Sequence, residues 1–128
     1  MRKVDMAVFF LLAAAPATLS AQRPEAGTWG GTVTPPESVA VPVSYLVRQS
    51  GDSLSITLTV PGVGSFDLRN LAFTGERMTF SWAPGDTMAT CQLMRRGDGS
   101  WAGPCRDSNG GMGAMLMTPP KKPGGAAE

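Results

Sequence analysis

Residues 53–60, Ser-Leu-Ser-Ile-Thr-Leu-Thr-Val, alternate without exception between a small hydroxyl side chain and an apolar side chain. Successive side chains of a β-strand point to opposite faces, so this pattern places the apolar residues on one face and the hydroxyl residues on the other. A helix would scatter the same apolar residues around its circumference. The stretch therefore predicts a strand in an antiparallel sheet that must curl or fold over to bury its apolar face.

The segment before this strand, residues 39–48, repeats the alternation and places on one face Val41, Val43, Tyr45 and Val47. Residues 49–52 form the predicted turn between the two strands. Folding the chain about this turn gives the pairs Val47 with Leu54, Tyr45 with Ile56, Val43 with Leu58 and Val41 with Val60. All of these pairs fall on the apolar face, which is the condition that a fixed register must meet.

Short segments of the same kind continue along the chain, separated by turns rich in Gly, Pro, Asn and Asp, and no helical pattern follows residue 21. The apolar phase slips by one residue between Leu68 and Leu71, so Asn70 is the expected position of a β-bulge. About eight short strands joined by short hairpins predict an all-β fold, a single antiparallel up-and-down meander that forms a closed or nearly closed barrel. A two-sheet sandwich is the alternative.

The chain has two cysteines, Cys91 and Cys105, and a predicted hairpin loop at residues 96–99 lies between them. Folding about this loop sets Arg95 opposite Trp101 and Cys91 opposite Cys105. Directly opposed residues of an antiparallel pair have Cα atoms about 4.5–5.5 Å apart, a range that overlaps the one disulfides need. The turn and the even cysteine count both predict one disulfide between Cys91 and Cys105.

Residues 1–21 have the layout of a secretory signal peptide, with a basic start, an apolar run over residues 6–15 and small residues before Gln22. The apolar run is short for a membrane span, and a signal anchor is the alternative. Gln22 occupies the position of the acylated Cys in a bacterial lipobox, so no lipid anchor is expected there. We expect an exported protein, periplasmic or secreted, with a barrel domain over residues 22–117 and a disordered tail over residues 118–128.

The charge balance argues against nucleic acid and anionic membranes as partners, because both are attracted by a strong positive field. Removal of Arg2, Lys3 and Asp5 with the signal peptide reduces the 11 basic and 10 acidic residues of the chain to 9 of each sign. The remaining charges are dispersed along the sequence. A net charge of zero provides no field to attract nucleic acid or an anionic membrane, so neither is an expected partner.

The sequence contains no His, which removes Ser-His-Asp and Cys-His catalysis and the usual zinc ligand sets. Several carboxylates fall in predicted turns, where Asp is favoured for backbone reasons: Asp52, Glu76, Asp86, Asp98 and Asp107. Residues 107–111 space their oxygen atoms as calcium loops do, but no nearby carboxylate completes such a loop, and they indicate a turn. We expect no enzymatic activity, no cofactor and no metal centre of these residues.

Of the eight methionines, six follow the signal peptide, and they allow two interpretations. Thioethers can hold Cu(I) in an exported protein, and Met115 and Met117 would share one strand face while Met88 and Met94 share another. Methionine is also a flexible filler of irregular cores. We favour the core-filling interpretation and keep the copper site as a hypothesis.

The first strand opens with Gly27-Thr28-Trp29 after a short polar lead, which resembles the G-x-W opening of lipocalin-like barrels. The layout is also similar to that of small secreted bacterial barrels that inhibit proteases or lysozyme. This resemblance implies a barrel with Trp29 closing one end. The chain is shorter than a lipocalin and has no Arg after Arg106, so we expect less interior space than a lipocalin encloses.

Three functions are compatible with these features. The first is a non-catalytic barrel that binds a small apolar molecule among inward aromatic residues, although the same side chains can fill a barrel of this size. The candidate ligand-binding residues are Trp29, Tyr45, Phe66, Phe80, Trp82 and Trp101. The second is a secreted inhibitor or interaction module that presents the rigid loop of residues 34–37 or the segment Pro119-Pro120 to a protein partner. The third is a structural envelope protein with no ligand.

Overall fold

The computed structural model describes residues 22–120. The predicted signal peptide, residues 1–21, and residues 121–128 of the predicted tail lie outside this part of the chain. Residues 22–120 form nine β-strands and no helix, so no helix there is long and apolar enough to cross a membrane. The strands are β1 (Gly27–Thr34), β2 (Val41–Ser50), β3 (Ser53–Val60), β4 (Gly64–Asp67), β5 (Arg69–Thr74), β6 (Arg77–Trp82), β7 (Ala89–Arg95), β8 (Trp101–Asp107) and β9 (Met112–Thr118).

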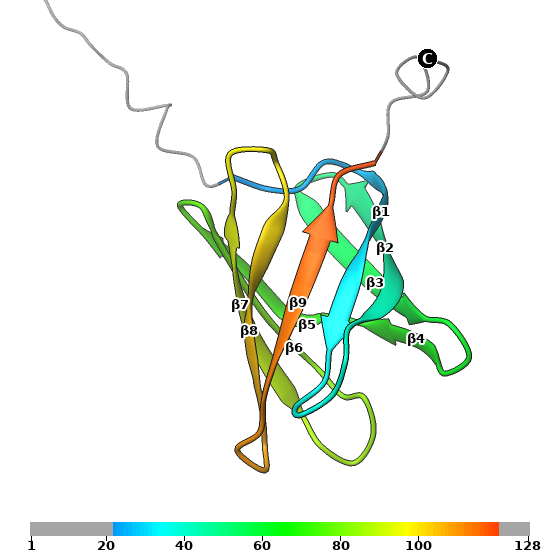
Figure 1. Cartoon of the computed structure of the whole chain (residues 1–128). Helices are drawn as coiled ribbons and strands as arrows, with labels where there is room; N and C mark the ends of the chain where they lie inside the picture. Colours follow the sequence, from blue (N-terminus) through cyan, green and yellow to red (C-terminus); the bar gives the residue numbers. More distant parts are fainter. Residues whose placement is uncertain (1–21, 121–128) are drawn as a thin grey trace, which may run out of the picture.

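The nine strands form one antiparallel sheet in the order β4-β3-β2-β1-β9-β8-β7-β6-β5. Sheet neighbours are also sequence neighbours, except that β1 pairs with β9 and thereby joins the two halves of the chain. The sheet curls into a nearly closed barrel with one unsealed seam, at its edge strands β4 and β5 (Figure 1). The predicted all-β meander barrel is confirmed, with nine strands in place of about eight.

The two edge strands are consecutive in the chain, separated only by Leu68, so the chain itself crosses the seam. The Leu68 N–H donates to the carbonyl oxygen of Ile56 in β3 at 3.0 Å, and the residues that follow pair with β6 instead. Asn70 has a φ of 55°, and the β5–β6 register shifts between Arg69 and Ala72. The predicted bulge at Asn70 is therefore confirmed, and it bends the strand from one neighbour toward the next.

The register of the β2–β3 hairpin differs by two residues from the predicted one, because the turn is shorter than four residues. It consists of Gly51 and Asp52, and Gly51 has a φ of 62°. A two-residue hairpin turn needs a positive φ at its first central position, which Gly adopts without strain. An even shift keeps each side chain on its predicted face. The observed pairs include Val47 with Ile56 and Tyr45 with Leu58.

The β7–β8 hairpin has the predicted register. Arg95 pairs with Trp101, and Cys91 pairs with Cys105 with Cα atoms 4.0 Å apart. The two cysteines form the predicted disulfide, and both are buried on the inner side of the sheet. A buried disulfide is consistent with an exported protein.

Side chains from alternate strand positions fill the barrel interior, as the period of two predicts. The core includes three methionines, Met78, Met115 and Met117, which are at most 2% exposed. The largest completely buried side chains are Trp101, Tyr45, Phe80, Ile56, Leu58, Met78, Leu93 and Met117.

The first and last described residues lie at the same end of the barrel, which we term the closed end (Figure 1). Residues 22–26 run across this end. The backbone N–H of Gln22 donates to the carbonyl of Gly75 at 2.8 Å, and Pro24 is buried. Arg23 spans the seam there, because its guanidinium donates to the Asp52 carbonyl at 3.2 Å and lies 5.3 Å from the centre of the Phe73 ring.

The C-terminal boundary of the fold lies beyond the predicted one. Strand β9 ends at Thr118, and Pro119 and Pro120 are half-buried at the closed end. A Cβ atom added to Gly27 would meet the Pro120 ring at 3.3 Å, and one added to Gly99 would meet the Pro119 ring at 3.4 Å. Residues 118–120 therefore belong to the packed domain and not to a disordered tail.

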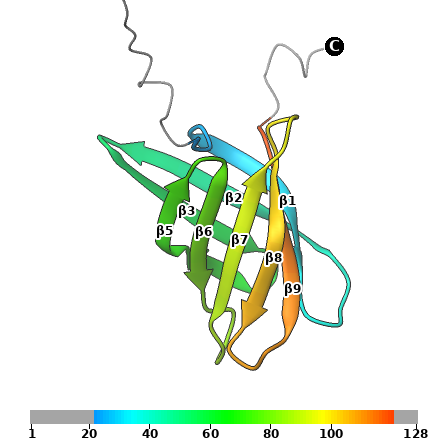
Figure 2. The same cartoon turned by 90° about the vertical axis from the view of Figure 1, so that its left-hand side faces the viewer.

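The opposite end of the barrel, which we term the open end, is formed by the loops of residues 35–40, 61–63, 83–88 and 108–111. Figure 2 shows the strands β5 to β9 side by side, with the last two of these loops below them. The loops of residues 35–40 and 83–88 carry Pro35, Pro36 and Pro84, whose side chains border a cavity at this end.

Candidate ligand-binding pocket

The six aromatic residues predicted to bind a ligand divide between the two ends and the middle of the barrel. Tyr45 and Phe80 lie in the middle and are completely buried. The Tyr45 hydroxyl donates to the carbonyl of Thr32 at 3.2 Å, and burial raises the pKa of this hydroxyl well above its ordinary value. These two side chains therefore act as core residues, and the hydroxyl group of Tyr45 is satisfied inside the protein.

Trp29 and Trp101 lie at the closed end. Their side chains are 3% and 1% exposed and form the floor of a shallow, mostly polar hollow beside residues 22–25. The Trp29 Nε1–H donates to the carbonyl of Glu25 at 2.9 Å, so the segment that covers this end also satisfies the indole. Phe73 of β5 packs edge-to-face on Trp101 with ring centres 6.3 Å apart.

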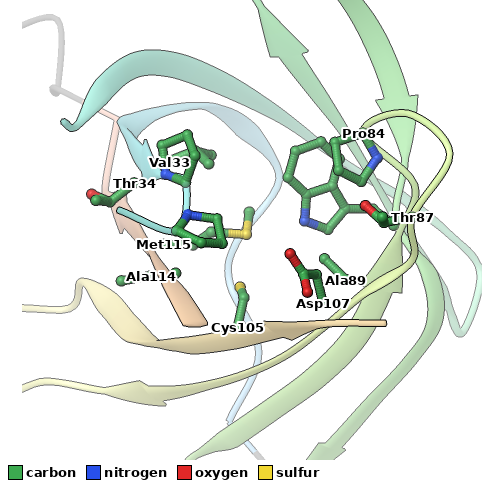
Figure 3. A pocket seen from close by; sticks show the side chains of 13 residues that line it. Val33, Thr34, Pro84, Thr87, Ala89, Cys105, Asp107, Ala114 and Met115 are labelled. Carbon is green, nitrogen blue, oxygen red and sulfur yellow. The ribbon is translucent and has the colours of Figure 1, made fainter. Parts of the chain in front are cut away.

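Trp82 and Phe66 lie together at the open end, with ring centres 5.2 Å apart in an edge-to-face arrangement. Trp82 lines a pocket of about 160 Å³ whose walls are largely apolar (Figure 3). Of the six predicted residues, Trp82 is the one that lines this pocket. The other residues that line it are Val33, Thr34, Pro35, Pro36, Pro84, Thr87, Ala89, Cys105, Asp107, Gly113, Ala114 and Met115.

Small residues create the space. In the sheet, Trp82 of β6 pairs with Ala89 of β7, and Ala89 pairs in turn with Asp107 of β8. The short Ala89 side chain thus stands in a row between an indole and a carboxylate on the inward face. On the other side, a Cβ atom at Gly113 would come within 2.4 Å of the carbonyl oxygen of Thr34, so β9 and the end of β1 approach closely only because Gly stands there.

The indole nitrogen of Trp82 is the unusual atom of the site. The side chain is 5% exposed, and its Nε1–H is buried and donates to no partner among the described residues. A buried donor without an acceptor costs about 1–3 kcal/mol, and most buried polar atoms in proteins are paired. The same group on Trp29 has a protein acceptor, so the two indoles differ in what the fold provides for them.

Asp107 contributes the carboxylate of the pocket and is half-buried. Its Oδ1 accepts hydrogen bonds from the backbone N–H groups of Asn109 at 3.0 Å and Gly111 at 2.8 Å, which fix the turn between β8 and β9. Figure 3 shows its carboxyl group beside Ala89 and Cys105, facing into the pocket. The turn predicted over residues 107–111 is confirmed, and its Asp also reaches a cavity that the sequence did not predict.

Metal ligands do not gather at this site. Among the described residues, no three His, Cys, Asp or Glu side chains lie close enough together to hold a metal ion. Met115 lines the pocket and its sulfur lies 3.5 Å from the Cys91 sulfur. Met88 and Met94 are 38% and 44% exposed, whereas Met115 and Met117 are buried in the core. The Cu(I) hypothesis for Met115 and Met117 stays a prediction.

Apolar residues also surround the mouth of the pocket. A second hollow shares the side chains of Val33, Pro35, Trp82 and Pro84 with the pocket and extends toward Pro61, Val63 and Phe66. The rim includes Val63, which is 66% exposed. In the loop of residues 35–40, the Ser38 N–H donates to the Pro35 carbonyl at 3.2 Å, and Glu37 has a φ of 55°.

Comparison of the chain with models of known protein families and with curated proteins finds no match. The candidate site therefore rests on its own geometry: an apolar pocket at the open end, a buried indole N–H without an acceptor among the described residues, and one carboxylate. Sequence reasoning identified Trp82 but missed Asp107 and Ala89. The alternation through β8 places Asp107 on the same face as Cys105, so its inward position was predictable. The pattern of residues 107–111 indicated only a turn.

Proposed function

We propose that this protein is an exported, non-catalytic barrel that binds one small, largely apolar molecule in the pocket at its open end. The observation that carries the proposal is the buried, unpaired Nε1–H of Trp82, a side chain that lines a pocket with apolar walls. A bound molecule with one hydrogen-bond acceptor would satisfy this donor and remove its desolvation cost. Ligand sites in proteins commonly combine an apolar lining with a few such polar groups.

The volume of the pocket limits the size of the ligand. A dry apolar cavity of about 150 Å³ can hold a molecule such as benzene, and this pocket has about 160 Å³. The buried part of the ligand is thus about the size of one six-membered ring with one substituent. Very small ligands gain at most about 1.5 kcal/mol per non-hydrogen atom, so a ligand of about eight such atoms gains at most about 12 kcal/mol, and its dissociation constant is nanomolar at the tightest.

The test is titration of the protein with phenol, benzyl alcohol, cyclohexanol and indole, followed by NMR chemical shifts and calorimetry. We expect saturable binding with one site, and shifts concentrated at the open end. Ala89→Leu should abolish binding, because the larger side chain fills the space between Trp82 and Asp107. Thr90→Leu introduces the same side chain at the neighbouring, exposed position on the outer face of the strand and should leave binding unchanged. Binding of none of the compounds would contradict the proposal.

A second function, an inhibitor or protein-interaction module, is favoured by the exposed apolar rim around the same mouth. Val63 is 66% exposed and lines the second hollow together with Pro35 of the loop of residues 34–37. A partner could insert one side chain into the pocket and cover the rim. In that case, Val63→Lys should remove a stoichiometric partner from the exported fraction while leaving small-molecule binding intact. Loss of both properties together, or of neither, would argue against a separate protein partner.

A further inference from the structure

Trp82 and Asp107 place a donor and an acceptor on either side of a short apolar floor, and the side chains of Thr34 and Thr87 line the same pocket. Trp82, Ala89 and Asp107 occupy paired positions on three adjacent strands, β6, β7 and β8. Adjacent strands are about 4.8 Å apart, so the Cα atoms of Trp82 and Asp107 are separated by roughly 10 Å. Both side chains line the same cavity with only the methyl group of Ala89 between them. A single ligand lying over Ala89 can therefore reach both polar groups.

The two polar groups have opposite requirements. The indole N–H of Trp82 can only donate a hydrogen bond, and a carboxylate can only accept one. Oδ1 of Asp107 already accepts from two backbone N–H groups of its turn. The carboxyl group faces the pocket in Figure 3, so it can also accept from a ligand. A hydroxyl group both donates and accepts, and it is the smallest neutral group that serves the two sites together.

The charge of the site adds a second constraint. Asp107 is the sole formally charged residue among the described residues that line the pocket, and neither Lys nor Arg is one of them. A ligand carboxylate placed beside Asp107 would bring two like charges together where apolar walls exclude water, without a cation to compensate. A ligand ammonium would be attracted to Asp107 but could not accept the hydrogen bond of Trp82.

We propose that the pocket selects small neutral alcohols or phenols over carboxylates and amines of the same shape, and that Asp107 determines this selectivity. The inference rests on the proposed function, since it names the class of ligand for the same pocket. Trp82 orients the hydroxyl oxygen, Asp107 receives its proton as a hydrogen bond, and the ring or alkyl body fills the apolar remainder. Asp107 thus has a role besides the backbone bonds that hold its turn.

The experiment compares ligands of one shape on the mature protein near neutral pH: benzyl alcohol, benzylamine, benzoate and toluene, by calorimetry or NMR titration. We expect benzyl alcohol to bind most tightly, with benzoate at least tenfold weaker. Trp82→Phe should reduce the affinity for benzyl alcohol to about that for toluene, because Phe keeps an aromatic ring but has no N–H donor.

The decisive variant is Asp107→Asn, which removes the charge and keeps a side-chain oxygen to accept from Asn109 and Gly111. We expect the preference for benzyl alcohol over benzoate to fall at least tenfold in this variant. Asp67→Asn makes the same charge change on an exposed residue whose carboxylate accepts from Thr57, and it should leave the preference unchanged. The ranking of the four compounds in the unmodified protein does not depend on whether either variant folds.

The outcomes separate the two proposals. If toluene and all of its relatives fail to bind, the proposed function fails. If toluene and benzyl alcohol bind but benzoate binds equally well, or Asp107→Asn leaves the preference intact, the selectivity inference is wrong while the pocket remains a binding site. If benzylamine binds most tightly and loses that binding in Asp107→Asn, the site selects cations and the inference is likewise overturned.

Discussion

Each end of the barrel contains a buried Trp, and the two differ in whether the indole N–H has a hydrogen-bond acceptor. At the closed end, the indole of Trp29 donates to the carbonyl of Glu25, in a segment that crosses the barrel mouth. At the open end, the indole of Trp82 is also buried but has no acceptor among the described residues. The comparison teaches that burying an indole does not by itself satisfy its N–H. At the closed end the covering segment supplies the acceptor, and at the open end the donor is left unpaired.

The largest effect on stability is expected from removing the disulfide. One of its cysteines, Cys105, lines the open-end pocket. In the chain-entropy model, closing a loop of about 15 residues contributes roughly 3 kcal/mol, and the bridged cysteines are 14 residues apart in the sequence. Replacing both cysteines by Ser should lower the free energy of unfolding by about this amount. Denaturant unfolding monitored by Trp fluorescence provides the measurement. A loss below about 1 kcal/mol would show that the barrel does not depend on this bridge.

A matched pair of substitutions addresses the contrast between the ends directly. Trp29→Phe leaves the Glu25 carbonyl without its donor and should cost about 1–2 kcal/mol more than Trp82→Phe, which removes a donor that had no acceptor. Both changes lose the same ring atoms, so the difference between them isolates the hydrogen bond. Thermal or urea unfolding of the two variants gives the comparison. Equal losses of stability would contradict the assignment of Trp82 as the unsatisfied indole.

A smaller effect is expected at Glu37, whose φ of 55° is unfavourable for a residue with a side chain. Glu37 follows Pro36 in the turn closed by the Ser38 to Pro35 hydrogen bond, a position at which Gly is preferred. Glu37→Gly should stabilise the protein by about 0.5–1 kcal/mol. Ser38→Gly, in the same loop, serves as the control and should be neutral or slightly destabilising. If Glu37→Gly destabilises the fold, the backbone strain inferred for this loop is wrong.

The smallest effect concerns Asp98 in the closed-end loop. Hydrogen bonds from the Ser100 hydroxyl at 2.6 Å and its backbone N–H at 2.9 Å hold the pKa of Asp98 below its ordinary value of 3.8. A carboxyl group whose pKa is lower in the folded state stabilises the fold above its unfolded-state pKa, and this contribution is lost as the pH falls through the folded-state value. Asp98→Asn should therefore flatten the loss of stability below pH 3.8. An unchanged acid profile would argue against this linkage.

The inward faces of the strands could be predicted from the sequence because a period of two distinguishes one face from the other. The same period cannot distinguish registers that differ by two residues, and for that reason the pairs around Tyr45 were wrong although Tyr45 itself is buried. The disulfide was predictable because the loop between Arg95 and Trp101 fixed one register independently.

The pocket was less predictable than the fold. Trp82 could be expected to face inward, but its lack of an acceptor depends on loops whose positions no periodicity specifies. The walls at Pro35 and Pro36 come from a loop that meets β9 only because β1 and β9 pair, a contact between opposite ends of the domain sequence. Asp107 matched a common turn pattern, and this pattern gave no indication that Asp107 also pairs with Ala89 in the sheet.

The placement of Gln22 and Pro120, the first and last described residues, at the same end of the barrel has a practical consequence. A partner domain fused directly at either of these two positions would join the barrel roughly one strand length, about 20 Å, from the pocket mouth. Such a fusion would leave the pocket mouth free for ligands to diffuse in and out, an arrangement suited to a sensor.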